Sequence, residues 1–202
     1  ADLSLEQIIA RLRAAHEQGL DVARVHTGDP ALYGAIGEQI RELDRLGIPY
    51  QVVPGVTAAF AGAAMLRREL TLPGVSQTLI LTRHAGKTPM PAGQSLPELA
   101  QHRATMAIYL SVDQLPDIVA ELTPHYGADC PVAVLHRVSW PDQDGVVGTL
   151  ADIAAQVEAK GFTRTALILV GQVIQPEGFP ASYLYSAEHA EAYRRDTDQA
   201  AR

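Results

Sequence analysis

The stretch Val25-His26-Thr27-Gly28-Asp29-Pro30-Ala31-Leu32-Tyr33-Gly34 indicates an α/β fold. An apolar, β-prone run over residues 21–26 ends in Thr-Gly-Asp-Pro, and a helical pattern with Ile36, Ile40 and Leu43 follows. Strand, tight turn and helix in this order place backbone N–H groups at the carboxyl end of a parallel strand, where α/β proteins bind ligands. Taken alone, Gly-Asp-Pro is also an ordinary turn.

A second stretch, Gln51-Val52-Val53-Pro54-Gly55-Val56-Thr57-Ala58-Ala59, repeats this pattern. It predicts a strand over Tyr50–Val53, a Pro-Gly turn, Thr57 as helix N-cap and a helix over 58–66. Two such turns, one βα unit apart, lie side by side in a parallel sheet. The sequence therefore predicts two adjacent glycine turns that face one ligand.

Composition restricts the class of protein. The chain has 202 residues, of which 47% are hydrophobic and 19% charged, with a formal net charge of -7. This acidic balance argues against nucleic-acid binding, which needs a basic face. No apolar run approaches the roughly 20 residues that span a bilayer, and no signal peptide opens the chain, so we expect no membrane partner and a cytoplasmic location. Cys130 is the single cysteine, and no His/Asp/Glu spacing indicates a metal site.

The rest of the sequence predicts an α/β protein with two domains. Ser4-Leu5-Glu6-Gln7 is a capping box at the start of a helix, and Gly47 ends a second helix over 35–46. Leu72-Pro73-Gly74 is the predicted joint between domains 1–74 and 75–202, with a loose tail from about 172 and a short helix over 186–195. For the second domain we predict strands at 78–82, 105–110, 131–135, 146–149 and 165–170, and helices at 116–126 and 150–160.

Together, and in this order, the two glycine turns resemble the tetrapyrrole (corrin/porphyrin) methyltransferase family. Within it, several motifs resemble the branch that methylates carbon 11 of precorrin-4 or cobalt-precorrin-4, in cobalamin biosynthesis. These motifs are Glu69-Leu70-Thr71-Leu72-Pro73, Ile80-Leu81-Thr82-Arg83, Ser139-Trp140-Pro141-Asp142 and Thr165-Ala166-Leu167-Ile168-Leu169-Val170-Gly171. The resemblance runs from about Leu5 to Gly171. It implies a mostly parallel N-terminal sheet with flanking helices, a mixed C-terminal sheet and an active site in the trough between them.

The resemblance implies S-adenosylmethionine as methyl donor and S-adenosylhomocysteine as product. Such a transfer requires alignment of donor and acceptor and exclusion of water, with few titrating groups. Carried onto this sequence, the family pattern implies cofactor contacts from two sets of residues. The first half contributes Thr27, Gly28, Asp29, Leu32, Thr57 and Ala58. The second half contributes Leu110, Val138, Thr165 and Ala166, for which core packing is an alternative at Leu110 and Ala166.

The implied substrate is an anionic tetrapyrrole, which an acidic protein must bind with local positive charge. Arg83, His84 and Lys87 follow a predicted strand and are the substrate-binding candidates, with a solvated loop as the alternative. Arg137, beside Trp140, is a second candidate. No general base and no catalytic side chain is identified. The resemblance also implies a homodimer.

Family members begin with a strand and a Gly-x-Gly-Pro-Gly-Asp-type turn, and this chain has no such motif. We therefore expect a shortened form that lacks part of the substrate site. Two alternatives remain open. The chain is another tetrapyrrole methyltransferase, such as one acting on uroporphyrinogen III, or a non-catalytic module that binds an adenosyl ligand or corrinoid.

Overall fold

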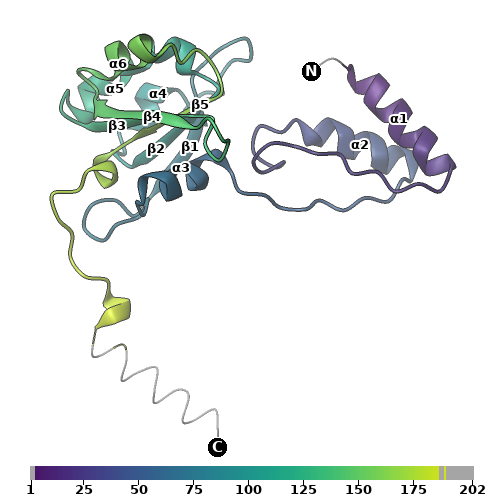
Figure 1. The fold of residues 1–202 in the computed structure, drawn as a ribbon, viewed down its shortest axis with the longest axis horizontal. Coiled ribbons are helices and arrows are strands. Elements are labelled where there is room, and N and C mark those ends of the chain that lie inside the picture. Colours follow the sequence, from purple (N-terminus) through teal and green to yellow (C-terminus); the bar gives the residue numbers. More distant parts are fainter. Residues whose placement is uncertain (1–2, 187–188, 190–202) are drawn as a thin grey trace, which may run out of the picture. The chain divides into compact units, whose positions relative to one another are not determined.

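The computed structural model describes residues 3–186 and 189 of the chain, which form two compact units (Figure 1). The units divide between Phe60 and Ala61, and each is described by itself. The joint predicted at residues 74–75 lies within the second unit in this division and stays a prediction.

The first unit contains the two predicted helices. Helix α1 (Leu5–Glu17) begins with the expected capping box, in which Ser4 Oγ accepts from Gln7 N–H at 3.3 Å and Gln7 Oε1 accepts from Ser4 N–H at 2.9 Å. Helix α2 (Ile36–Leu46) ends at Gly47, whose φ of 66° lies in the left-handed region that favours glycine. Local sequence signals therefore fix both helices.

The two strands predicted in the first unit are not formed among the described residues. Residues 21–26 and 50–53 exchange no backbone hydrogen bonds, and the first strand of the described chain begins at Leu79. Both segments instead line a groove of about 670 Å³, together with side chains of α1 and α2. An apolar, β-branched pattern favours an extended backbone, but a strand exists only through hydrogen bonds to a partner. Val25 and Val53 are accordingly 78% and 69% exposed.

The second unit is built on a five-stranded mixed sheet of order β1-β2-β5-β3-β4, which confirms the α/β class. Its strands are β1 (Leu79–Arg83), β2 (Thr105–Tyr109), β3 (Pro131–His136), β4 (Asp144–Thr149) and β5 (Ala166–Val170). β1 runs parallel to β2, whereas β5 is antiparallel to β2 and β3. β1, β2 and β3 therefore all end at one edge of the sheet, the edge at which β5 begins.

Helices cover both faces of this sheet (Figure 1). α4 (Leu96–Ala100), α5 (Leu115–Tyr126) and α6 (Ile153–Lys160) pack on the face that buries Met106, Val134 and Ile168. α3 (Ala58–Leu66) lies on the other face, where a Cβ added at Gly62 would come within 2.8 Å of Leu135 Cδ1. β5 is thus buried on both faces, as its continuous apolar run predicts.

The elements predicted for the second half are confirmed to within three residues at each end. The sequence reading missed α4, although Ser95 and Glu98 form a capping box at its start. The core also extends past residue 172, because Val173 and Ile174 are buried in a 3-10 turn. The helix predicted over 186–195 lies mostly outside the described residues.

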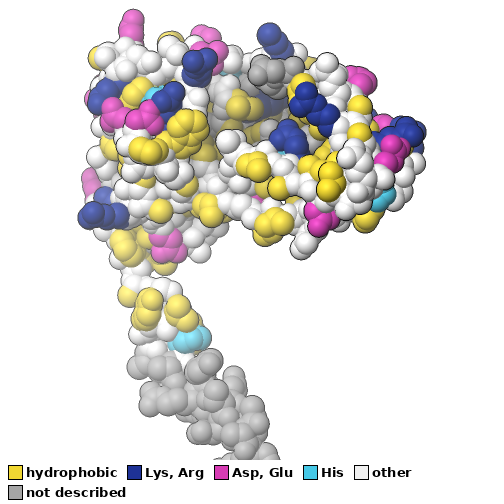
Figure 2. Space-filling view, turned by 45° about the vertical axis from the view of Figure 1, so that its right-hand side comes forward, with side chains coloured by type: hydrophobic (Ala, Val, Ile, Leu, Met, Phe, Trp, Pro, Cys, Tyr) yellow, Lys and Arg dark blue, Asp and Glu magenta, His cyan; other side chains and the backbone are white. Residues whose placement is uncertain are grey.

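The described surface carries mixed charge. On the face shown in Figure 2, Lys and Arg side chains are interspersed with Asp and Glu. No helix among residues 3–186 and 189 is long and apolar enough to cross a bilayer.

Ile168→Ala should remove about 2–5 kcal/mol from the free energy of unfolding, because Ile168 is fully buried at the centre of the sheet. Urea unfolding measures this loss. The control Val147→Ala on strand β4, where Val147 is 39% exposed, should change stability by less than about 1 kcal/mol. Equal losses in both variants would contradict the central position of β5.

Cys130 should react with a thiol reagent only when the protein unfolds. Its side chain is buried, and burial raises the pKa of the thiol to about 11. Dithionitrobenzoate titration at pH 8 should show slow reaction of the native protein and complete reaction in urea. Fast native reaction would mean that the core around β3 opens readily.

Candidate functional site

The Asp29 carboxylate joins the two glycine turns of the first unit. Asp29 Oδ1 accepts from the Ala31 N–H at 2.8 Å within its own turn, and Oδ2 accepts from the Gly55 N–H at 3.0 Å in the other turn. Both bonds favour the charged carboxylate and lower the pKa of Asp29 below its ordinary value of 3.8. The Gly55 N–H has the larger effect and the Ala31 N–H the smaller one. The predicted adjacency of the turns is thereby confirmed.

Glycine is required at Gly55 by the close approach of the two turns and is favoured at Gly28 by its positive φ. A Cβ added at Gly55 would lie 2.1 Å from the carbonyl oxygen of Gly28, a distance that no side chain tolerates. Gly28 has a φ of 66° and packs against the backbone of Thr57, with 3.7 Å between its added Cβ and the Thr57 Cα. The two turns therefore present a narrow backbone surface without side chains at its centre.

The other predicted cofactor residues of the first unit surround these turns. Thr27 is exposed and directly precedes Gly28. The Leu32 N–H donates to the Asp29 carbonyl at 3.2 Å, which closes the first turn, and Leu32 itself is half-buried. Thr57 is buried at the end of the second turn, and Ala58 begins α3. The structure thus brings Thr27, Gly28, Asp29, Leu32, Thr57 and Ala58 into one region of the first unit.

The predicted cofactor residues of the second unit gather at one edge of its sheet. Ile108 lies opposite Ile168, and continuing this register brings Leu110 level with Ala166. His136, at the end of β3, also pairs with Ala166, and Val138 follows two residues later. The strand order therefore collects Leu110, Val138, Thr165 and Ala166 from three separate segments.

The backbone at this edge is unusual. Leu110, Arg137, Ser139 and Thr165 all have positive φ, at 57°, 47°, 71° and 55°. Non-glycine residues rarely adopt this conformation, and such residues concentrate at functional sites. The Arg137 N–H donates to the Thr165 carbonyl at 2.9 Å and so fixes two of these turns together. Leu110 is 71% exposed, which is contrary to core packing.

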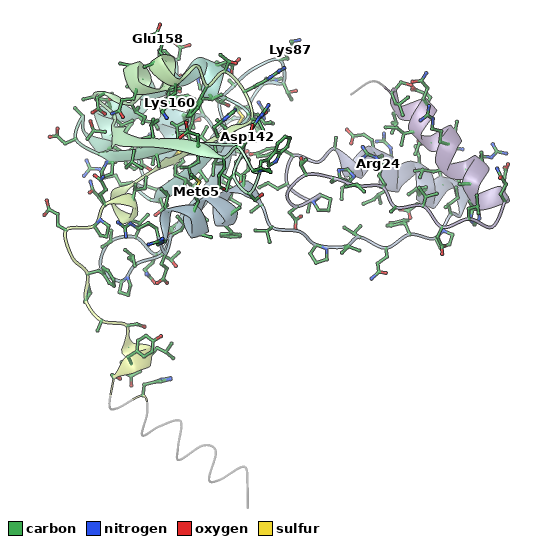
Figure 3. All side chains as sticks on the ribbon, viewed as in Figure 1. Arg24, Met65, Lys87, Asp142, Glu158 and Lys160 are labelled. Atoms are coloured by element: carbon green, nitrogen blue, oxygen red, sulfur yellow. The ribbon has the colours of Figure 1, made fainter. Side chains whose placement is uncertain are left out.

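Arg83 is the last residue of β1, and His84 and Lys87 lie in the loop that follows it. The Arg83 guanidinium donates to the backbone carbonyls of His84, Thr88 and Pro89 at 3.2, 2.9 and 3.2 Å, and so shapes the loop. Figure 3 shows Lys87 on this loop, where it is exposed.

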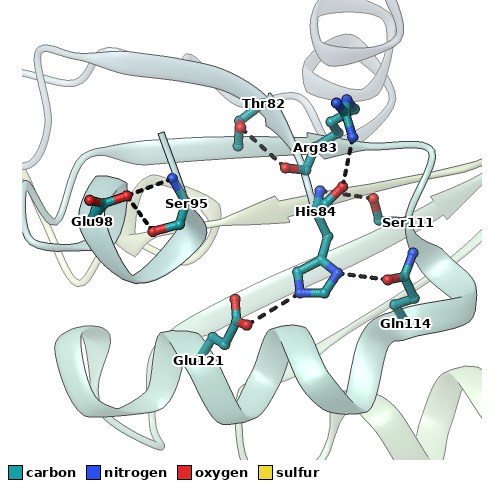
Figure 4. A network of polar contacts seen from close by, with 8 residues as sticks. All are labelled: Thr82, Arg83, His84, Ser95, Glu98, Ser111, Gln114 and Glu121. Atoms are coloured by element: carbon teal, nitrogen blue, oxygen red, sulfur yellow. Dashed lines mark hydrogen bonds and ion pairs between the residues drawn. The ribbon is translucent and has the colours of Figure 1, made fainter. Parts of the chain in front are cut away.

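The His84 ring faces α5 and its preceding turn (Figure 4). Its Nδ1 lies 2.7 Å from Gln114 Oε1 and its Nε2 lies 3.3 Å from Glu121 Oε1. Its backbone N–H donates to Ser111 Oγ at 3.0 Å. His84 thus holds the end of β1 against the segment after β2, and both ring nitrogens already have partners.

The sequence analysis did not predict two features of the site. The left-handed backbone of Leu110, Arg137, Ser139 and Thr165 carries no local signal, because none of these residues is glycine. The polar contacts of His84 join residues 27 to 37 positions apart in sequence, and residue spacing alone does not reveal such pairs. In the described part of the chain, no group of three or more His, Cys, Asp or Glu side chains is placed to hold a metal ion.

Comparison with known proteins gives one consistent result. Residues 1–154 match the family model of Tetrapyrrole (Corrin/Porphyrin) Methylases. The precorrin-4 C(11)-methyltransferase of Pseudomonas aeruginosa is 66% identical over 194 residues, which cover 96% of this chain and 78% of that protein.

Solved structures agree. The X-ray structure of the cobalamin biosynthetic enzyme cobalt precorrin-4 methyltransferase superposes with a TM-score of 0.84 at 40% identity, over 87% of this chain and 74% of that one. The uroporphyrin-III C-methyltransferase of Thermus thermophilus, in complex with S-adenosylhomocysteine, has a TM-score of 0.63 at 26% identity, over 85% and 75% of the two chains. With glycine turns, mixed sheet and sequence all in agreement, this chain belongs to the tetrapyrrole (corrin/porphyrin) methylase family.

Proposed function

We propose that this chain transfers the methyl group of S-adenosylmethionine to carbon 11 of precorrin-4 or of its cobalt form. The support is the 66% identity to a precorrin-4 C(11)-methyltransferase together with a structural neighbour that is a cobalt precorrin-4 methyltransferase. The observation that carries the proposal within this structure is the tie between Asp29 and Gly55, because it builds the backbone surface on which an adenosyl ligand can rest.

The paired turns suit the methionine and ribose part of the donor. The crowded contact of Gly55 with the Gly28 carbonyl leaves exposed backbone that a ligand can approach closely. We assign Thr27, Gly28, Asp29, Leu32, Thr57 and Ala58 to this part. The relative that was solved with S-adenosylhomocysteine supports an adenosyl ligand for the family fold.

The sheet edge of the second unit suits the adenine. Leu110 offers an exposed apolar side chain, and both Leu110 and Thr165 have a left-handed backbone, a conformation that concentrates at functional sites. We assign Leu110, Val138, Thr165 and Ala166 to the adenine. These residues come from segments of the second unit that are not adjacent in sequence.

For the acceptor we assign carboxylate contacts to the loop after β1. Arg83 retains guanidinium donors beyond its three carbonyl bonds, and Lys87 is exposed on the same loop. His84 supports this loop through Gln114 and Glu121, so its contribution to substrate binding is the position of its neighbours.

Methyl transfer from S-adenosylmethionine requires few titrating side chains. Bound S-adenosylmethionine supplies a methyl group on a positively charged sulfur, which is already a good leaving group. The protein's part is to hold donor and acceptor in line and to exclude water. The ionised Asp29 is tied to two N–H groups, which keeps it from acting as a competing nucleophile. We identify no general base.

A methyl-transfer assay with precorrin-4 and with cobalt-precorrin-4, combined with calorimetry of S-adenosylhomocysteine binding, tests the proposal. We expect binding and transfer to carbon 11, located by NMR of the product. Transfer to uroporphyrinogen III alone would favour the alternative substrate, and binding without transfer would favour a non-catalytic module. No binding would exclude all three. Sedimentation of the same sample tests the homodimer, which stays a prediction.

Asp29→Asn should weaken S-adenosylhomocysteine binding by about tenfold, as expected when a charge-assisted hydrogen bond is lost. Asparagine has one carbonyl oxygen and cannot accept from Gly55 and Ala31 with two separate oxygens. Calorimetry measures the affinity, and thermal unfolding checks the fold. The control Asp117→Asn on α5 should bind like the wild type. Unchanged affinity in Asp29→Asn, or a large loss of stability with normal affinity, would place the donor elsewhere.

The Asp29 contribution should also depend on pH in a defined direction. Its pKa is lowered in the folded protein, so its stabilisation is fully present above 3.8 and is lost as the pH falls through the lowered pKa. The difference in melting temperature between wild type and Asp29→Asn should therefore be constant from pH 5 to 8 and shrink below pH 4. A difference that shrinks between pH 5 and 7 would contradict the two N–H bonds.

A further inference from the structure

The turn between β3 and β4 places an arginine at the sheet edge described above. Arg137 follows the last residue of β3, and its backbone N–H is held by the Thr165 carbonyl at 2.9 Å. The Trp140 N–H donates to the Arg137 carbonyl at 3.0 Å, and Gln143 Oε1 accepts from the Ser139 N–H at 2.9 Å. Left-handed φ values at Arg137 and Ser139 complete a tightly tied turn. The backbone of Arg137 is thus fixed.

The guanidinium of Arg137 is only partly satisfied. Its Nη1 donates to the Asp142 carboxylate, and its Cζ lies 5.2 Å from the centre of the Trp140 ring. Its Nε is buried and has no hydrogen-bond partner. An arginine offers five donors in a planar fork, and a carboxylate binds best when it takes two of them. Asp142, which is labelled in Figure 3, takes one donor from an exposed position on the turn.

Arg83, at the end of β1, is engaged differently. The Arg83 guanidinium donates hydrogen bonds to three backbone carbonyls of the loop that follows it. Arg137 instead pairs with a single, exposed carboxylate, which a stronger carboxylate ligand can replace without disturbing the backbone. The flat face of Trp140 keeps the fork oriented during that exchange.

We propose that Arg137 binds a carboxylate of the tetrapyrrole acceptor and that Asp142 occupies the same guanidinium until the acceptor displaces it. Arg137 is then a specificity-determining residue for polycarboxylate tetrapyrroles, and Asp142 is a competing internal anion. This inference rests on the proposed function for the identity of the acceptor. Its test is chosen to be independent of methyl transfer.

The binding probe is uroporphyrin I, a stable porphyrin with eight carboxylates, titrated by absorbance and fluorescence. Arg137→Ala should weaken its binding about tenfold, and Arg137→Lys should stay within about threefold of the alanine variant, because lysine keeps the charge without the fork. Asp142→Asn should bind the porphyrin more tightly than the wild type, because the competing anion is gone. Affinity for S-adenosylhomocysteine should be unchanged in all three.

The matched control is Arg45→Ala, which removes another exposed arginine with a single carboxylate partner, Glu42 at 2.9 Å. It should bind uroporphyrin like the wild type. In the methyl-transfer assay, Arg137→Ala should raise KM for the tetrapyrrole about tenfold with kcat unchanged.

Three results would overturn the inference. The first is a wild type that binds uroporphyrin no more tightly than Arg137→Ala. The second is Asp142→Asn weakening binding as much as Arg137→Ala, which would make the pair a structural bond. The third is an equal loss of S-adenosylhomocysteine affinity. If wild type binds uroporphyrin through Arg137 but transfers no methyl group, the proposed function fails while this inference stands.

Discussion

The carboxylate of Asp29 is the constraint on which the first unit's surface depends. One oxygen closes its own turn at Ala31 and the other accepts the Gly55 N–H across to the second turn. The bridge adds to the backbone packing between these turns, which are 27 residues apart: Gly55 packs against the Gly28 carbonyl, and Gly28 packs against the Thr57 backbone. A charged acceptor is effective here because both donors are backbone N–H groups, whose positions are fixed by the chain.

In the second unit, strand order rather than a bridging side chain brings the candidate cofactor residues together. Placing β5 antiparallel between β2 and β3 makes β2 and β3 end beside the start of β5. Segments around residues 110, 138 and 165 therefore meet at one edge although they are far apart in sequence. The same edge carries four residues with left-handed backbone, Leu110, Arg137, Ser139 and Thr165. It also carries the Arg137 guanidinium, whose Nε has no hydrogen-bond partner.

Much of the fold could be read from local signals. The Ser4 capping box, Gly47 and the apolar run of β5 each act over a few residues, and each led to the correct element. The extended segments at 21–26 and 50–53 were misread as strands, because hydrophobic pattern reports what a segment favours and not whether a partner is present. For the site, the glycine turns were predictable from Gly28 and Gly55. The role of the His84 ring was not, since its partners lie in α5 and the turn before it.

The sequence by itself determined the family, the α/β class and the pairing of the two glycine turns, because these depend on short motifs and on the order of those motifs along the chain. Only the tertiary structure decided which oxygen of Asp29 reaches Gly55, that His84 turns toward α5, and that Arg137 keeps an unpartnered Nε beside Trp140. These contacts arise where separate elements meet. Their geometry is set by packing and strand register, which residue spacing does not encode.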